Sequence, residues 1–300
     1  METIELESVT KSYNSNTVIE DISFSVGPGE IFGLLGPNGA GKTTTLRMML
    51  DIIKPDSGNI RVFGKKLDPD SKDRTGYLPE ERGLYKKSKV IELLVYLAQL
   101  KGMTKIHALE HAKSLLQSIG MSEHKEKKIE ELSKGMQQKI QFIATIIHDP
   151  DLIVVDEPFS GLDPVNTQII KNNLLEQKKA GKTIILSTHM MEQAEVMCDR
   201  ILMINKGVIV LDGKVRDIRN EHRNNSIFLE FEGNLASLKE IDLIENIISH
   251  GTYIEIFPKE GHDIQSLIED IVKRVRILRL EQSTPSLNDI FITIVKGVSS

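Results

Sequence analysis

The first thirty residues alternate between apolar and polar side chains. Ile4 and Leu6 begin one alternating run, and a second follows the turn-rich segment Asn14–Asn16. A period of two is typical of strands that bury one face. The second run closes on Gly27–Gly29, another turn signal. The pattern predicts antiparallel strands at the N-terminus.

Three later segments are continuously apolar. They cover residues 31–35, 152–155 and 183–186. Such a run predicts a strand that is buried on both faces, as in a parallel sheet. Helical segments lie between them, the first expected at 42–50. Because strands alternate with helices, the sequence predicts an α/β fold.

Apolar residues recur at helical spacing in the region before the second apolar run. Ser88 is expected to cap a first helix, and Thr104 a second one that stops at Gly120. The charged stretch Glu123–Glu131 is interpreted as a solvated connection. Together these features predict a helical subdomain of about 83–148.

A polar stretch, Asn220–Asn225, is interpreted as a linker. It predicts a first domain over residues 1–219 and a second over 226–300. In the second domain, strand-like alternation precedes one helical stripe that runs from Ile264 to Val275. The second domain is therefore predicted to be a small α+β unit.

Composition is that of an ordinary globular protein of 300 residues, with 40% hydrophobic residues and a formal net charge of -5. The mild acidity gives no reason to expect nucleic acid as a partner. The single Cys198 excludes an internal disulfide and fits a reducing compartment. The N-terminus lacks the pattern of a signal peptide, and no apolar run approaches the roughly 20 residues that cross a bilayer. Any membrane role is therefore expected to come through a partner.

The segment GPNGAGKT fits the phosphate-loop pattern GxxxxGK[ST]. Its glycines would let backbone N–H groups wrap phosphate oxygens, and the following helix would point its positive end at them. Lys42 is expected to neutralise the β- and γ-phosphates, Thr43 to bind Mg²⁺, and Thr44 to reach the α-phosphate. A glycine turn that happens to precede a lysine is the alternative, which the preceding strand and following helix disfavour. The expected ligands of the nucleotide here are Gly36, Pro37, Asn38, Gly39, Ala40, Gly41, Lys42, Thr43 and Thr44.

A second group of candidates follows the later apolar runs. Asp156 is expected to hold Mg²⁺ through water, and Glu157 to polarise the attacking water. A strand capped by acids before Pro158 would explain the pair alone, but the phosphate loop favours the catalytic interpretation. His189 follows the last run and is assigned to the γ-phosphate, since ligands of open α/β sheets lie at the carboxyl ends of strands.

Between these motifs the segment LSKGMQQ, which begins at Leu132, resembles the LSGGQ signature of the ATP-binding cassette family. The resemblance covers about residues 1–215. It implies a P-loop cassette with a parallel core sheet, an antiparallel β subdomain and a helical subdomain. It implies that Tyr13 stacks on adenine and that Ser160–Asp163 forms the D-loop, with Asp163 near the nucleotide. It also implies that Ser133 and Gly135 contact ATP held by a second cassette, either identical or a paralogue, so that two cassettes enclose two ATP molecules.

Two departures from the family pattern stand out. Lys134 and Met136 replace a glycine and a glutamine of the signature. Glu80 stands where the family usually has a glutamine that reaches Mg²⁺. Our hypothesis is that Glu80 keeps the metal role and retunes hydrolysis, because a carboxylate suits the ion.

Three functions are compatible with such an ATPase. A subunit that energises a separate integral membrane permease is favoured, at the inner face of the cell membrane and on the cytoplasmic side. A soluble ATPase acting on a macromolecular machine is the alternative, and a regulatory protein without turnover is disfavoured by the intact Lys42 and Glu157. GYLPEERGLY and LSKGMQQK resemble bacterial sodium- or drug-efflux subunits with a small C-terminal domain, which favours export. Residues 81–100 are expected to receive the permease.

Overall fold

The computed structural model describes residues 2–14, 16–81, 83–222, 226–259, 261, 263–282 and 285–297. The chain divides into two compact units, Met1–Val215 and Arg216–Ser300. Part of the expected linker, residues 223–225, lies outside the described residues. Each unit is described by itself below.

A six-stranded sheet forms the centre of the first unit, in the order β5-β6-β7-β3-β8-β9. The strands from β5 to β8 are parallel, and β9 pairs with β8 in the antiparallel direction. Their bounds are β3 (Ile31–Leu35), β5 (Thr75–Leu78), β6 (Leu152–Asp156), β7 (Thr183–Thr188), β8 (Arg200–Asn205) and β9 (Val208–Lys214). Because neighbouring parallel strands point the same way, the chain segments that follow β3, β6 and β7 meet at one edge.

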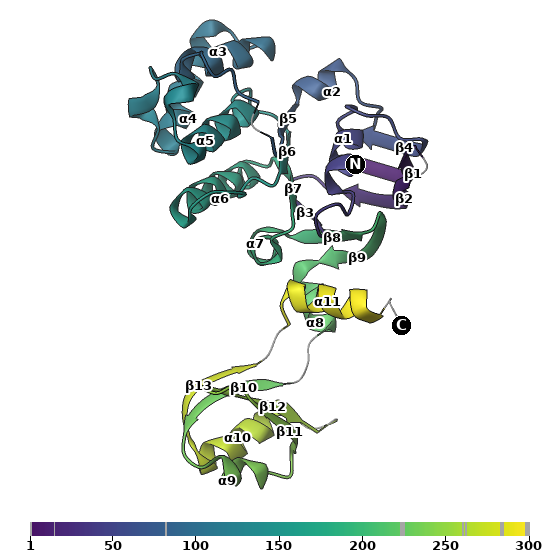
Figure 1. Ribbon diagram of the computed structural model, residues 1–300, viewed down its shortest axis with the longest axis vertical. Coiled ribbons are helices and arrows are strands. Elements are labelled where there is room, and N and C mark those ends of the chain that lie inside the picture. The colour runs from purple at the N-terminus through teal and green to yellow at the C-terminus, as the bar shows by residue number, and fades with distance from the viewer. Residues whose placement is uncertain are drawn as a thin grey trace. The chain divides into compact units, whose positions relative to one another are not determined.

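Helices cover both faces of this sheet. Figure 1 shows α5, α6 and α7 on one side and α1 with a second, three-stranded sheet on the other. All residues of β3, β6 and β7 are buried, as their central apolar runs predict. The helices are α1 (Lys42–Met49), α5 (Lys134–Ile146), α6 (Pro164–Lys179) and α7 (Met191–Met197).

The second sheet is antiparallel, in the order β2-β1-β4. Its strands are β1 (Ile4–Tyr13), β2 (Asn16–Val26) and β4 (Ser57–Val62), and the short helix α2 (Pro69–Asp73) follows. Apolar residues of this sheet share one core with α1 and with the six-stranded sheet. The alternating pattern at the N-terminus therefore correctly predicted strands with one buried face.

Three helices form a separate apolar core within the first unit: α3 (Val90–Leu100), α4 (Lys105–Ser118) and α5. Thr104 caps α4 by accepting a hydrogen bond from the backbone N–H of His107 at 3.4 Å. The expected cap at Ser88 is wrong. Lys89 precedes the first residue of α3, and Ser88 instead accepts a backbone hydrogen bond from Ile129 at 3.0 Å. Two short 3-10 turns, Ser122–His124 and Ile129–Glu131, occupy the charged connection before α5.

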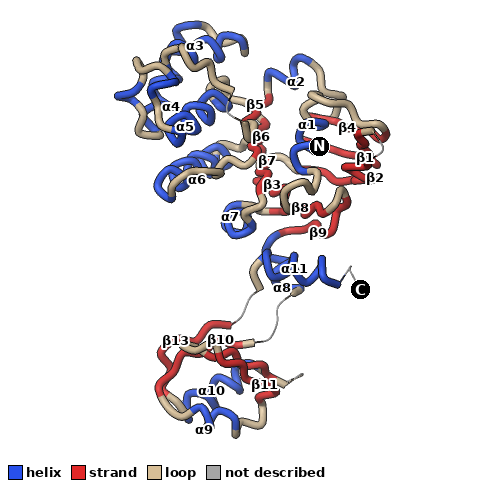
Figure 2. Tube along the Cα trace, in the orientation of Figure 1, coloured by secondary structure: helices blue, strands red, loops and turns tan. Residues whose placement is uncertain are grey.

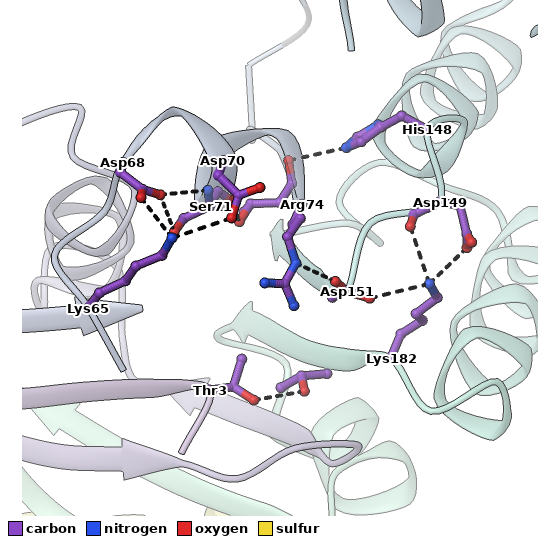
Figure 3. Close-up of polar contacts among 12 residues, drawn as sticks. Thr3, Lys65, Asp68, Asp70, Ser71, Arg74, His148, Asp149, Asp151 and Lys182 are labelled. Carbon is purple, nitrogen blue, oxygen red and sulfur yellow. Dashed lines mark hydrogen bonds and ion pairs between the residues drawn. The ribbon is translucent and has the colours of Figure 1, made fainter. Parts of the chain in front are cut away.

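Polar contacts join the amino ends of the parallel strands (Figure 3). Arg74, before β5, donates from Nε to Asp151, before β6, at 2.6 Å. Lys182, before β7, forms an ion pair with Asp149 at 2.9 Å. The hydroxyls of Thr3 and Thr183 lie 3.2 Å apart. These contacts fix the strand starts and leave the strand ends free for other groups.

Cys198 lies against β3 in the interior of the first unit. Only 8% of its surface is exposed, and burial raises the pKa of its thiol. A Cβ atom on Gly33 would lie 2.8 Å from its sulfur, so the thiol fills the space that the glycine leaves. The thiol is therefore a packing group.

The second unit contains a four-stranded antiparallel sheet in the order β11-β12-β10-β13, with two helices between its strands. This β-α-β-β-α-β arrangement is the ferredoxin-like motif. The helices α8 (Val215–Glu221) and α11 (Leu287–Gly297) flank it in the sequence. The elements of the motif are β10 (Ile227–Glu232), α9 (Leu235–Lys239), β11 (Ile244–Ser249), β12 (Ile254–Pro258), α10 (Ile264–Arg274) and β13 (Arg276–Gln282).

No described helix in either unit combines the length and the apolar character that crossing a membrane requires.

Candidate functional site

The phosphate loop joins the end of β3 to the start of α1, and two of its glycines are required by their surroundings. A Cβ atom on Gly36 would lie 2.1 Å from the carbonyl oxygen of Ile204. A Cβ atom on Gly41 would lie 2.4 Å from Cδ1 of Ile19, and its φ is +111°. Because Gly41 caps α1 without a side-chain hydrogen bond, the first N–H groups of the helix have no side-chain partner at the cap. The loop thus has the form that receives an anion.

Lys42 lies almost fully buried inside this loop, with 6% of its surface exposed. Its Nζ donates to the carbonyl oxygens of Gly36 at 2.8 Å and Pro37 at 3.2 Å. The same atom lies 3.6 Å from Oε1 of Glu157. The ammonium group is therefore held between the loop and a carboxylate.

Asp156 ends β6 and is completely buried. It accepts hydrogen bonds from Ser187 Oγ at 2.7 Å and from Thr43 Oγ1 at 2.9 Å. Desolvation by burial raises the pKa of its carboxyl group, and the nearby charge of Glu157 raises it further. The register of the sheet places Asp156 opposite Ser187, which explains the first bond.

The oxygen atoms of Asp156 and Thr43 form a donor set of the kind that Mg²⁺ prefers. Glu80 lines the same hollow as Thr43 and has carboxylate oxygens of the same kind. In the described parts of the chain, no group of three or more His, Cys, Asp or Glu side chains could hold a metal ion unaided. The residues fit a magnesium ion that keeps waters and takes phosphate oxygens as its other ligands.

Glu157 adopts a left-handed backbone conformation, with φ +48°, directly after β6. Its Oε1 accepts from the backbone N–H of His189 at 3.0 Å and lies 2.8 Å from Nδ1 of that ring. Its Oε2 accepts from Thr188 Oγ1 at 3.1 Å. The carboxylate is 6% exposed, so these contacts hold both oxygens at a set position.

A hollow of about 340 Å³ opens over these groups. Val18 also lines it, and no sequence signal distinguishes that residue from the other apolar positions of β2. Ser187 and Thr188 precede His189 in the sequence, but only the register with β6 shows that they contact the carboxylates. The full lining is Val18, Asn38, Gly39, Gly41, Lys42, Thr43, Thr44, Glu80 and Glu157.

Three predicted site residues, Tyr13, Ser133 and Asp163, lie outside the hollow over the phosphate loop. Tyr13 is 46% exposed at the end of β1, with Nζ of Lys11 5.5 Å from its ring centre. Ser133 caps α5 by accepting from the N–H of Met136 at 3.3 Å. Asp163 caps α6, and the backbone N–H of Asn166 lowers the pKa of its carboxyl group.

These three residues and Gly135 do not line the hollow over the phosphate loop. A Cβ atom on Gly135 would lie 3.4 Å from Nδ2 of Asn166, at the start of α6. The signature and the D-loop therefore lie together at the starts of α5 and α6, outside the hollow of their own chain.

Comparison with known proteins decides the family. Over 296 residues the chain is 38% identical to the uncharacterized ABC transporter ATP-binding protein YhaQ of Bacillus subtilis (strain 168), and the match covers 98% of each. This chain belongs to the ABC transporter ATP-binding proteins. As such a subunit it binds and hydrolyses ATP and energises a membrane transporter with a permease partner. The alternative of a non-transport ATPase is set aside.

Further matches of this ATP-binding subunit agree. The family of ABC transporters matches residues 19–160, and the ATP-binding protein DrrA1-3-like C-terminal domain matches 213–295. The Nod factor export ATP-binding protein I of Bradyrhizobium diazoefficiens is 33% identical over 297 residues, or 97% of this chain and 95% of that protein. A solved ATP-binding subunit of an ABC transporter superposes with a TM-score of 0.68 at 31% identity, covering 73% of this chain and 92% of that one.

Proposed function

We propose that the chain hydrolyses ATP as a dimer of cassettes, with Mg²⁺, to drive export through a permease at the cytoplasmic face of the membrane. One observation carries the proposal of a dimer. The hollow over the phosphate loop contains Lys42, Glu80 and Glu157 but no residue of the signature. A second cassette would supply Ser133 and Gly135 to the γ-phosphate.

The contacts of Lys42 indicate how ATP would engage the site. In the structure, Lys42 neutralises Glu157 and donates to two loop carbonyls. Phosphates in the loop would attract the ammonium group more strongly than a single carboxylate does. Lys42 would then leave Glu157, whose carboxylate becomes available to a water.

Hydrolysis needs a base beside the attacking water. Glu157 would orient that water and receive its proton, because its oxygens lie at the edge of the hollow and are fixed from β7. The Nδ1 atom of His189 faces Glu157, which leaves Nε2 for the γ-phosphate. Mg²⁺, held by Thr43, Asp156 and Glu80, would neutralise charge that develops on the phosphates.

The direction of transport and the permease contact rest on separate support. A relative that matches almost the whole chain is named for Nod factor export, which favours export here. Tyr85, Tyr96 and Leu100 are at least half exposed within the expected contact region 81–100. Exposed apolar side chains of this kind suit a docking surface.

Mixing two inactive variants tests the dimer and the site together. Lys42→Ala removes one half of a composite site, and Ser133→Arg removes the other half. In a mixed dimer, the intact loop of one copy would meet the intact signature of the other. After random exchange half of the dimers are mixed, with one working site of two, so about a quarter of the normal rate should return.

Each variant alone serves as the control and should be inactive. No recovery, despite exchange of subunits shown by two affinity tags, would contradict the composite site.

Glu157→Gln should in addition trap a dimer that retains ATP, visible by size-exclusion chromatography. A normal rate of hydrolysis by Glu157→Gln would remove the assigned base.

A further inference from the structure

The sheet of the second unit has one face that α9 and α10 do not cover. Figure 2 shows both helices on the same side of β10 to β13. Ile227, Leu229 and Ile256 are fully buried in the core that includes these helices. Since side chains alternate along a strand, Phe228, Glu230 and Glu255 lie on the opposite face, which we call the open face.

Aromatic rings form part of the open face. Phe228 and Tyr253 meet edge to face, with ring centres 5.5 Å apart and planes at 87°. His250 stacks on Tyr253 at 4.9 Å and 22°. Beside the first two rings lies a hollow of about 280 Å³, lined by Phe228, Leu229, Glu230, Tyr253, Arg279 and Glu281. A ligand in this hollow would contact aromatic carbon on one side.

The charged groups around the rings favour a positive ligand. Arg279 donates to Glu281 at 2.6 Å and lies 3.8 Å from Glu230, so two carboxylates surround one guanidinium. Glu255 accepts from the buried Ser226 hydroxyl at 2.7 Å, and His250 lies 3.4 Å away. The charged residues that line the hollow, Glu230, Glu281 and Arg279, sum to a formal charge of -1, and Glu255 adds a further carboxylate to the open face.

The same charges disfavour two other occupants. Aromatic residues on a four-stranded sheet stack nucleobases in some RNA-binding domains, but here three carboxylates would repel the phosphates. A second copy placed face to face would oppose one negative surface with another. A cation meets neither kind of charge repulsion, and it is attracted by the faces of aromatic rings as well as by carboxylates.

We propose that the hollow between Phe228, Tyr253 and Glu230 binds a small organic cation that carries a flat apolar group. The apolar group would lie against the rings, and the cationic centre would approach Glu230 and Glu281. The size of the hollow suits a compact molecule of this kind. Binding here requires neither ATP nor the phosphate loop, so the proposal is independent of the catalytic site.

Fluorine NMR of the full chain labelled with 3-fluorotyrosine tests this proposal. The chain has five tyrosines, and Tyr253→Phe assigns the signal of interest. Benzyltrimethylammonium should shift the Tyr253 signal saturably, whereas benzoate, an anion of similar shape, should not. No saturable shift with the cation, or an equal response to benzoate, would overturn the proposal. So would a response to tetralysine without one to benzyltrimethylammonium, because it would assign the face to a basic peptide.

Variants locate the binding within the hollow. Glu230→Gln combined with Glu281→Gln should weaken binding about fivefold, since it removes two charges without changing shape. Phe228→Leu should weaken it about threefold by removing the π-face. The control is Phe257→Leu, on the neighbouring strand β12 but not part of the lining. Unchanged affinity in the double glutamine variant, with the Tyr253 signal preserved, would contradict the charge argument.

Discussion

The hydroxyl group of Thr188 donates a hydrogen bond to the carboxylate of Glu157. It accepts a hydrogen bond from the N–H of Met190 at 3.0 Å, so its single hydrogen is directed to Oε2 of Glu157. Thr188 is completely buried, and no solvent competes for this contact. We therefore regard it as a positioning residue for Glu157.

Thr188→Val should lower kcat for ATP about tenfold, because a hydrogen bond to a charged group contributes roughly 1.5–3 kcal/mol. The KM for ATP should stay nearly unchanged, and Thr188→Ser should restore the rate. Thr183→Val is the matched control at the other end of β7, where the hydroxyl contacts Thr3 (Figure 3). Equal losses of kcat in both valine variants would indicate a general packing effect instead.

Asp156 should make the protein less stable in the absence of nucleotide. Its pKa is raised by burial, so the folded state binds this proton more tightly than the unfolded state does. The free energy of unfolding therefore falls as pH rises from the unfolded to the folded pKa. Asp156→Asn should raise Tm at pH 7 and have little effect at pH 3, while it abolishes hydrolysis. A Tm gain that is equal at both pH values would show that charge is not the cause.

Glu80 is the departure from the family pattern that lies inside the hollow. Glu80→Gln removes one negative charge near the expected magnesium position. The Mg²⁺ concentration for half-maximal hydrolysis should rise several-fold, since a carboxylate binds this ion more strongly than an amide. Glu81→Gln is the adjacent control. An unchanged rate and Mg²⁺ dependence in Glu80→Gln would remove Glu80 from the metal site.

At the scale of elements, β5 approaches α5 very closely. A Cβ atom on Gly76 would lie 2.2 Å from the carbonyl oxygen of Thr145. Gly76→Ala must displace α5, which begins at the signature. We expect a loss of about 1–3 kcal/mol in the free energy of unfolding, measured with urea. Gly83→Ala, where a Cβ atom meets nothing within 4 Å, should have a much smaller effect.

The elements that the sequence could predict are those with local signals. The continuous apolar runs predicted β3, β6 and β7, because a strand buried on both faces has apolar residues at successive positions and these runs are too short for a buried helix. The absence of a cap at Ser88 could not be predicted, since the backbone contacts of Ser88 with Ile129 and of Lys89 with Lys128 join segments that are about 40 residues apart in the sequence. The bonds from Ser187 and Thr188 to the carboxylates depend on the register between β6 and β7, which no short motif encodes.

At the scale of the whole molecule, each unit has a core of its own. Apolar clusters lie within the described residues of the first unit, and a separate one is formed by the sheet and helices of the second. Deleting residues 221–300 should therefore leave a folded first unit with a cooperative thermal transition. Unchanged dimerisation and transport after this deletion would refute a regulatory role for the second unit. Loss of the transition would show that the first unit depends on the second for folding.

The packing of Cys198 against Gly33 makes this protein well suited to spectroscopy. Its one native thiol is buried and resists deprotonation, so maleimide and methanethiosulfonate reagents should react with it slowly. A cysteine introduced at the exposed Lys179, at the end of α6, would carry a spin label without removal of the native thiol. Distances between two such labels would report the opening and closing of paired cassettes during turnover, in otherwise native protein.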